Sequence, residues 1–279
     1  MIINFLLKPS RVFLLSVYFS LFLILFITSL DFIGVWILIE ISGLVFLCII
    51  LRVASRARYT SNIIYFILQA CFGINIIILF IAESFFFRVS RITTVFILTK
   101  VGAAPLNVLY FYSLNFLDTL LFFLALSTQK LFPVFLLITH FSSAHLVLLF
   151  IILSSIIIIF LSSNTNPIRR VLITRSLFNS SWLVITSMVG YPLVLIYFLI
   201  YSFFLFLILF KNLSLVPFIT LIGLPPFPLF FVKLRVIYFL LLTSQLISIL
   251  SLTLFTLFLS SLAILSIYFN TITQIKHNS

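Results

Sequence analysis

Long apolar runs alternate with short polar segments along the 279 residues of the chain. A transmembrane helix needs about 20 consecutive apolar residues, whereas the strands of a membrane barrel alternate apolar and polar positions over stretches of about ten. The runs have helical length, so the pattern predicts an all-α polytopic membrane protein with about ten transmembrane helices. The predicted spans cover residues 11–30, 32–51, 61–83, 92–113, 117–139, 143–162, 167–188, 191–210, 215–240 and 244–269.

The predicted spans divide into two sets of five within a single membrane domain over residues 1–279. The first five-helix repeat would cover residues 11–139 and the second residues 143–269. The fourth span of each set contains glycine and proline, with Pro105 in the first and Pro225 in the second. Helices interrupted at corresponding positions of two halves are typical of inverted-repeat transporters. We therefore predict two inverted five-helix repeats, antiporter-like, with broken helices near these two prolines.

Composition supports the membrane interpretation, because 64% of the residues are hydrophobic and only 7% are charged. A soluble domain is about half apolar and about a quarter charged. The mean hydropathy is +1.43. Water-driven burial of a core therefore does not organise this chain, and packing against lipid and between helices replaces it.

The net charge of +12 would suggest nucleic acid as a partner in a soluble protein. Here the basic residues lie mostly in short loops, which favours a role in topology and in contacts with anionic lipids. Ten spans would sort most loop cations to one side, so both termini are predicted to lie on the inner side. The majority side holds Lys8, Arg11, Arg52, Arg56, Arg58, Arg169, Arg170, Lys211 and Lys276, and the other side holds Arg88 and Arg91.

Three lysines interrupt membrane-length apolar segments, and each has a proline within a few residues: Lys100, Lys130 and Lys233. A charge at the centre of the bilayer costs about 2.5–3.5 kcal/mol on insertion scales and generally marks a functional site. The three are candidate stations of a proton relay. The alternative for each is a side chain that snorkels to the membrane surface. Snorkelling fits Lys233 best, because it lies nearest a helix end, and Lys130 worst.

Glu40 lies about eight residues into the second predicted span, about two helical turns from its start. A carboxylate beside a buried lysine stabilises the protonated amine, and its withdrawal favours release of the proton. Glu40 is therefore the predicted partner of a relay lysine. The alternative is a carboxylate that pairs with one neighbour for folding alone.

Arg175 and Asn179 lie one helical turn apart in the least apolar of the predicted spans. Arg175 is near the basic edge of that span, so it is predicted to snorkel to the surface. Asn179 and the two serines that follow it either line a hydrated path or form hydrogen bonds between helices.

The cysteines and histidines suggest no redox or metal chemistry. Cys48 and Cys71 lie inside apolar runs without CxxC spacing and are predicted to be small packing residues. His140 and His145 flank a span boundary and are predicted to be interfacial, because haem or metal ligation would need further ligands at suitable spacing. The chain also lacks the glycine-rich motifs of nucleotide sites. No cofactor or metal is therefore predicted to bind.

Five segments, in order, resemble the antiporter-like membrane subunits of respiratory complex I. The segment VWILIEISGLVF is similar to the glutamate-bearing helix of that family, and TKVGAAPLNVLYFY is similar to its K-x-G-x-A-P-x-H-x-W segment. The segment STQKLFPVFLL resembles the W-Q-K-x-x-P segment typical of the subunit 2 branch of mitochondrial NADH dehydrogenase. The segments NPIRRVLITRSLFNSSW and GLPPFPLFFVKLRV resemble two further family motifs, so the resemblance extends over residues 30–240.

The resemblance implies inverted five-helix repeats with a half-channel in each and a central line of Glu and Lys. It implies that Glu40 and Lys100 form a modulating pair, that Lys130 is the central proton carrier and that Lys233 is the outlet station. Gln129 belongs to the lysine motif of the subunit 2 branch, and Arg175 and Asn179 would lie beside the path.

The resemblance also implies a place in the cell and a set of partners. The chain would lie in the mitochondrial inner membrane with both termini on the matrix side, among other membrane subunits of complex I and anionic lipids such as cardiolipin. NAD, FMN, iron–sulfur clusters and ubiquinone would belong to other subunits. Quinone reduction there would drive proton translocation here.

The chain departs from the family pattern at several positions. Asn107 and Asn179 stand where the family has histidine, Thr174 and Arg175 replace Tyr-Ser, and Leu229 and Val232 replace Gly and Pro. Any proton step through the two histidines is thus in doubt. Three other functions remain open: another antiporter-like subunit or a stand-alone cation/proton antiporter, a solute transporter with a pocket at the broken helices, and a passive scaffold in a respiratory assembly.

Overall fold

The computed structural model describes most of the central part of the chain, which is helical apart from short turns and contains no β-strand in the described residues. The described residues are 32–53, 59–83, 90–102, 119–139, 144–163, 168–210 and 226–243, together with Phe111, Leu114, Thr220, Leu221, Gly223 and Phe258.

Five of the predicted spans in this part of the chain correspond closely to single helices, whereas the predicted spans 92–113, 117–139 and 215–240 correspond to shorter ones. The helices are α3 (Phe32–Val53), α4 (Tyr59–Glu83), α5 (Ser90–Val101), α7 (Thr119–Leu126), α8 (Thr128–Thr139), α9 (Ala144–Ser163), α10 (Ile168–Val189), α11 (Tyr191–Phe210) and α13 (Pro228–Thr243).

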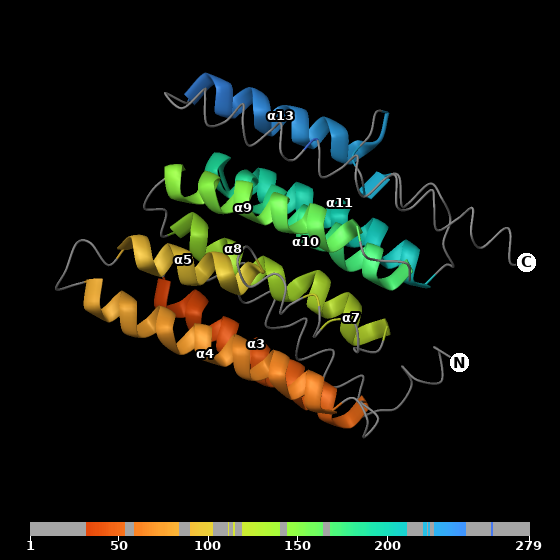
Figure 1. Ribbon diagram of the computed structural model, residues 1–279. Coiled ribbons are helices and arrows are strands. Elements are labelled where there is room, and N and C mark those ends of the chain that lie inside the picture. Colours follow the sequence, from red (N-terminus) through yellow and green to blue (C-terminus); the bar gives the residue numbers. More distant parts are fainter. Residues whose placement is uncertain are drawn as a thin grey trace, which may run out of the picture.

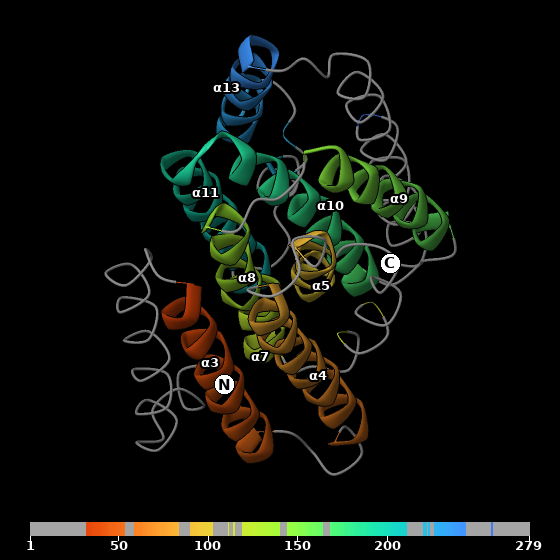
Figure 2. The same ribbon diagram turned by 90° about the vertical axis from the view of Figure 1, so that its left-hand side faces the viewer.

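The helices lie side by side in successive layers (Figure 1). α3 and α4 form one layer, α5, α7 and α8 the next, and α9, α10 and α11 the third, with α13 beyond them. α5 packs against α4 and α8, and α10 packs against α8, α9, α11 and α13. Seen more nearly along their axes, the helices place α10 towards the middle of the molecule (Figure 2).

The outer faces of the helices are strongly apolar. Large hydrophobic side chains are exposed on α4, α9, α11 and α13, including Ile78, Phe160, Phe203 and Phe231. Of the described helices, four are long and apolar enough to cross a membrane: the segments Phe32–Ile49, Ile63–Glu83, Leu121–Thr139 and Tyr191–Leu209. Their lengths match the span of a bilayer, since each residue adds about 1.5 Å.

The polar residues gather inside instead. α10 is the least apolar of the long helices, yet its described side chains are almost all buried. Its serines and threonines return hydrogen bonds to carbonyls one turn back, as in Thr174 to Val171 O (2.9 Å) and Thr186 to Leu183 O (2.7 Å). Such bonds satisfy hydroxyl donors inside a helix without a second element. The neighbours of α10 thus shield a polar helix from lipid.

Helical structure stops near the two prolines that predicted breaks. α5 ends at Val101, and Gly102 adopts φ 93° and donates its N–H to Thr99 O (3.0 Å). Before α13, Gly223 adopts φ 73° and donates its N–H to Thr220 O (3.0 Å). Positive φ is freely available only to glycine, which makes these residues natural helix ends. Pro105 and Pro225 themselves lie outside the described residues.

A further interruption, at Ser127 between α7 and α8, was not predicted. Pro133 lies six residues later, inside α8, and its ring removes the N–H that would bond to the carbonyl of Gln129. The predicted span 117–139 is therefore two helices, and the break precedes Lys130 by less than one turn.

Several predictions concern residues or side chains that the structure does not describe. These are the span 11–30, nearly all of the span 244–269, both chain termini, most of the basic loops, Asn107, His140 and the side chain of His145. The ten-span count and the sidedness of the loops therefore stay predictions.

The two cysteines correct one prediction. Cys48 and Cys71 were expected to be packing residues, but both are exposed on the outer faces of α3 and α4. The opposite faces of α3 and α4 pack inward, so both thiols contact the surroundings of the helix bundle.

Candidate functional site

The three relay lysines are buried, as predicted from the cost of exposing a cation to lipid. The exposed fractions are 4% for Lys100, 1% for Lys130 and 6% for Lys233. Snorkelling is therefore excluded for Lys233, the lysine for which it seemed most plausible. Its helix, α13, turns the lysine towards α10, so the ammonium group lies among buried rings.

Glu40 and Lys100 form an ion pair between α3 and α5. Lys100 Nζ lies 2.5 Å from Glu40 Oε1, and the exposed fraction of the Glu40 side chain is 27%. Lys100 occupies the last turn of α5, where the partial negative charge of the helix end favours a cation. The sequence predicted that Glu40 partners a relay lysine, and the resemblance implied that this lysine is Lys100. The interruption after Val101 places Lys100 at the end of its helix.

Lys130 has a different kind of partner. Its ammonium donates hydrogen bonds to Ser176 Oγ (2.7 Å) and to Ser176 O (3.0 Å) on α10. Within the described ranges, no carboxylate accepts a hydrogen bond from Lys130. A serine hydroxyl can accept from an ammonium and donate to a neutral amine, so this contact suits either protonation state. Ser176 was missed by sequence reasoning, which singled out its neighbour Arg175 instead.

The break at Ser127 is satisfied by side chains. The Ser127 hydroxyl donates to Phe123 O (2.6 Å), and the Thr128 hydroxyl donates to Leu124 O (3.1 Å). The Tyr201 hydroxyl of α11 donates to Leu126 O (3.2 Å) and also forms a hydrogen bond with the side chain of Ser176. One tyrosine therefore links the helix break to the partner of Lys130.

Gln129 fixes the position of the same helix on its other side. Its Nε2 donates to Ser42 O of α3 at 3.4 Å. The turn that carries Lys130 is thus held by α3 and by α11. Through this bond Gln129 supports the position of α8 against α3.

Arg175 corrects the prediction that it snorkels. It is 1% exposed, and within the described part of the chain none of its three guanidinium nitrogens has a hydrogen-bond partner. Its guanidinium carbon lies 5.3 Å from the centre of the Phe178 ring. The prediction assumed that the start of this helix meets the membrane surface freely, but α10 is enclosed on all sides by other helices.

Lys233 lies on the aromatic side of α10. Its Nζ is 5.0 Å from the centre of the Phe178 ring and 5.0 Å from the Trp182 ring. The positive charge of Arg175 acts on it as well. The face of an aromatic ring attracts a cation by about 2 kcal/mol when both are desolvated. Rings and a neighbouring cation thus surround this lysine, in contrast to the carboxylate beside Lys100.

Asn179 occupies the centre of α10. Its Oδ1 accepts a hydrogen bond from the Tyr197 hydroxyl (2.9 Å), while its Nδ2 has no partner in the described residues. Two residues on, the Ser181 and Ser154 hydroxyls are 3.0 Å apart and join α10 to α9. The observed contacts are hydrogen bonds between helices, and the hydrated path stays a prediction.

The charged residues come from helices that neighbour one another across the bundle. Glu40 on α3 pairs with Lys100 on α5, α5 packs on α8 with Lys130, and α8 packs on α10. α10 then contacts α13, which carries Lys233. The order is the order of the layers in Figure 1, so the buried charges follow one another from one side of the molecule to the other.

No group of three or more His, Cys, Asp or Glu side chains gathers in the described residues in a way that could hold a metal ion. No protein family model matches the chain, and no curated protein matches it.

Proposed function

We propose that the chain is a proton-translocating membrane subunit of respiratory complex I (NADH:ubiquinone oxidoreductase), of the antiporter-like subunit 2 type, in the mitochondrial inner membrane. One observation carries the proposal: three buried lysines on three different helices, α5, α8 and α13, the first of them paired with a glutamate. Buried ionisable residues inside membrane helices are costly and mark proton and ion paths.

The Glu40–Lys100 pair sets when the first lysine holds its proton. With the carboxylate at 2.5 Å, the protonated amine is stabilised by its counter-charge. When the carboxylate withdraws, the same amine is left charged in an apolar interior and gives up its proton. A change in the position of one side chain therefore loads or unloads the site.

Lys130 is the central carrier in this mechanism. Its proton moves on or off Nζ, while the Ser176 hydroxyl reorients from acceptor to donor as the lysine becomes neutral. Lys233 is the outlet, because the rings of Phe178 and Trp182 hold the protonated form and the neighbouring Arg175 charge opposes it. The chain carries no electron-transfer step of its own in this proposal, and quinone reduction in other subunits drives the cycle.

The test replaces Lys130 with methionine in the assembled complex, reconstituted in vesicles, with electron transfer and proton uptake measured separately. Lys130→Met keeps the length of the side chain and removes the ionisable group, so packing changes little. We expect electron transfer to continue with coupled pumping abolished or strongly reduced. We expect Glu40→Gln to cause a milder loss.

Two further variants make the Lys130 test specific. Leu137→Met changes a buried side chain on the same helix and should leave pumping normal. Lys130→Arg keeps a charge that does not titrate in proteins, so it should fail like Lys130→Met. Normal coupling in a fully assembled Lys130→Met complex would refute the mechanism.

A further inference from the structure

Gly73 lies in the middle of α4, facing the Glu40–Lys100 ion pair. A Cβ atom built on Gly73 would overlap Glu40 Oε1 and would lie 2.7 Å from Lys100 Nζ. The ion pair therefore occupies the space that a side chain at position 73 would fill. Glycine is disfavoured inside helices, so its presence in the centre of a 25-residue helix calls for a local reason.

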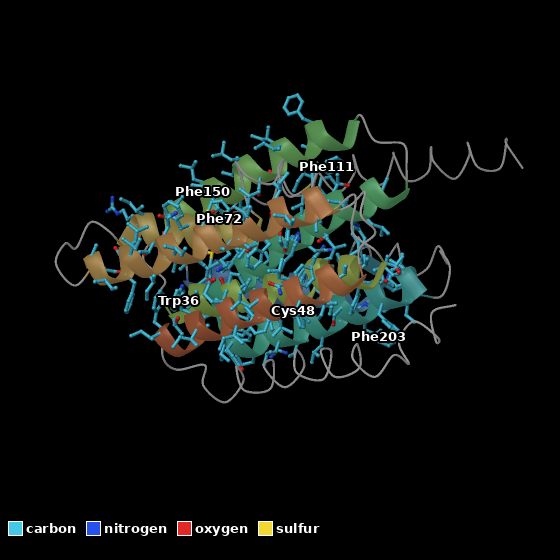
Figure 3. The ribbon with its side chains drawn as sticks, turned by 90° about the horizontal axis from the view of Figure 1, so that it is seen from below. Trp36, Cys48, Phe72, Phe111, Phe150 and Phe203 are labelled. Carbon is cyan, nitrogen blue, oxygen red and sulfur yellow. The ribbon has the colours of Figure 1, made fainter. Side chains whose placement is uncertain are left out.

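A second contact fixes the same point of α4. The indole Nε1 of Trp36 donates a hydrogen bond to the carbonyl oxygen of Gly73 (2.8 Å). Trp36 and Glu40 are four residues apart on α3 and so lie on the same face of that helix. Figure 3 shows Trp36 on α3 and Phe72, the residue before Gly73, on α4 at a similar level along the bundle. α3 thus meets the backbone of α4 through both the indole and the carboxylate.

We propose that Gly73 and Trp36 are positioning residues for the Glu40–Lys100 pair: the bare backbone at Gly73 makes room for the pair, and the indole of Trp36 holds α3 at that distance from α4. Neither residue carries a proton. The inference deepens the proposed function, because it states what lets the carboxylate reach the first lysine of the relay.

The missing side chain at Gly73 also explains how the ion pair joins α3 and α5 although α4 lies between them. α4 packs against both α3 and α5, so a side chain at position 73 would stand between the carboxylate and the amine. A methyl group there must displace Glu40 Oε1, because the two would overlap. The pair then opens, and the carboxylate is left without its cation.

Gly43 offers a matched control on the neighbouring helix. It lies three residues from Glu40 on α3, and no atom lies within 4 Å of a Cβ built on it. Gly43→Ala and Gly73→Ala make the same chemical change in the middle of long membrane helices. Only the second one meets the ion pair.

The first experiment measures the state of Glu40 without any reference to pumping. A hydrophobic carbodiimide reacts with protonated carboxyl groups, and the full-length chain purified in detergent is labelled and its Glu40 adduct quantified by mass spectrometry. A carboxylate held against the Lys100 ammonium is covered by it, whereas one displaced from the ion pair is open to the reagent. We expect several-fold faster labelling in Gly73→Ala, approaching the rate in Lys100→Met, and an unchanged rate in Gly43→Ala.

Trp36→Phe supplies a second variant in case the glycine variant does not fold. It keeps the aromatic packing and removes the indole donor, so labelling of Glu40 should rise, but less than in Gly73→Ala. A thermal unfolding curve confirms that each labelled variant is folded. Wild-type labelling rates in folded Gly73→Ala and folded Trp36→Phe would overturn the proposal.

The second experiment separates positioning from general packing. In assembled complexes, Gly73→Ala should reduce coupled pumping to the level of Glu40→Gln. The double variant Glu40→Ala/Gly73→Ala should behave like Glu40→Ala alone, because the methyl group then has no carboxylate to displace. A further loss in the double variant would show that Gly73 acts through helix packing instead, and would refute the assigned role.

The two proposals fail separately. If Lys130→Met and Glu40→Gln both leave pumping normal, the relay is refuted, while the labelling experiment still decides whether Gly73 seats the ion pair. If labelling does not respond to Gly73→Ala but Lys130→Met stops pumping, the relay stands and the positioning role is lost.

Discussion

Arg175 carries its charge in the most enclosed helix of the described structure. Burial of a cation costs several kcal/mol, and a cation–π contact returns about 0.5–2 kcal/mol of that. The Phe178 ring, 5.3 Å away, therefore offsets the cost only in part. What the charge does contribute is a positive potential at Lys233.

We predict that Arg175→Met raises the stability of the purified chain. Replacing a buried charged group with an apolar one of similar volume is often neutral or stabilising by about 1–4 kcal/mol. Arg235→Met is the matched control, because Arg235 is exposed on α13 and its loss should change stability by no more than about 0.5 kcal/mol. Thermal unfolding in detergent measures both. A lower unfolding midpoint for Arg175→Met would mean that the guanidinium has an anionic partner in the folded protein.

Single residues also show where sequence reasoning reached its limit. The lysines and Glu40 were identifiable, because a charge in an apolar run is costly wherever the run packs. Ser176 was not, because serine in a helix gives no signal until the packing of α8 on α10 brings Lys130 to its hydroxyl. Arg175 was misjudged for the related reason that hydropathy shows how polar a helix is, but not which neighbours enclose it.

Among the elements, the α7–α8 junction places a helix break directly before Lys130. The break leaves backbone carbonyl groups without their helical hydrogen bonds. Lipid supplies no water to bond to them, so each needs another donor. The Tyr201 hydroxyl donates a hydrogen bond to Leu126 O (3.2 Å) and forms a second one with the side chain of Ser176. α11 therefore contacts both the backbone just before Lys130 and Ser176, whose hydroxyl accepts the hydrogen bond from Lys130.

We predict that Tyr201→Phe destabilises the chain by about 1–3 kcal/mol, the cost of leaving a buried acceptor without its donor. The ring and its packing remain, so the effect reports the hydroxyl alone. Tyr238→Phe is the control, because Tyr238 is 61% exposed and should tolerate the change. Unfolding curves of the two variants are compared in the same detergent. Equal curves for Tyr201→Phe and the wild type would show that another group satisfies Leu126 O.

Most helices could be predicted from apolar length alone. The spans 191–210 and 143–162 correspond to α11 (Tyr191–Phe210) and α9 (Ala144–Ser163). The break at Ser127 could not, since the polar residues 127–130 lie between long apolar stretches and the nearest proline, Pro133, lies six residues later and is itself inside α8. A proline indicates that a helical turn is weakened, but packing determines at which residue the helix is interrupted.

For the whole molecule, the distribution of polarity is the reverse of a soluble protein. Ile74 and Ile78 of α4 are each 55% exposed, whereas Lys130 and Arg175 are buried. Asn75 is an exception to this pattern: it is exposed between those isoleucines, and its Nδ2 donates to Cys71 O (2.9 Å). Amides on membrane helices typically bond to a neighbouring helix, which favours a protein partner on this face of α4.

We predict that the chain migrates in native electrophoresis within a very large assembly that has NADH dehydrogenase activity. In this assembly the outward face of α4 meets another membrane subunit. Asn75→Leu should therefore lower the fraction of chain in the assembly, because it removes the amide from that contact. Ile78→Leu, one turn away on the same face, keeps an apolar side chain and should leave the fraction unchanged. Migration of the wild-type chain alone, without any redox activity, would favour a stand-alone cation/proton antiporter. The buried Glu40–Lys100 pair and the lysines beyond it would serve that function by the same proton steps, so assembly is the property that separates the two.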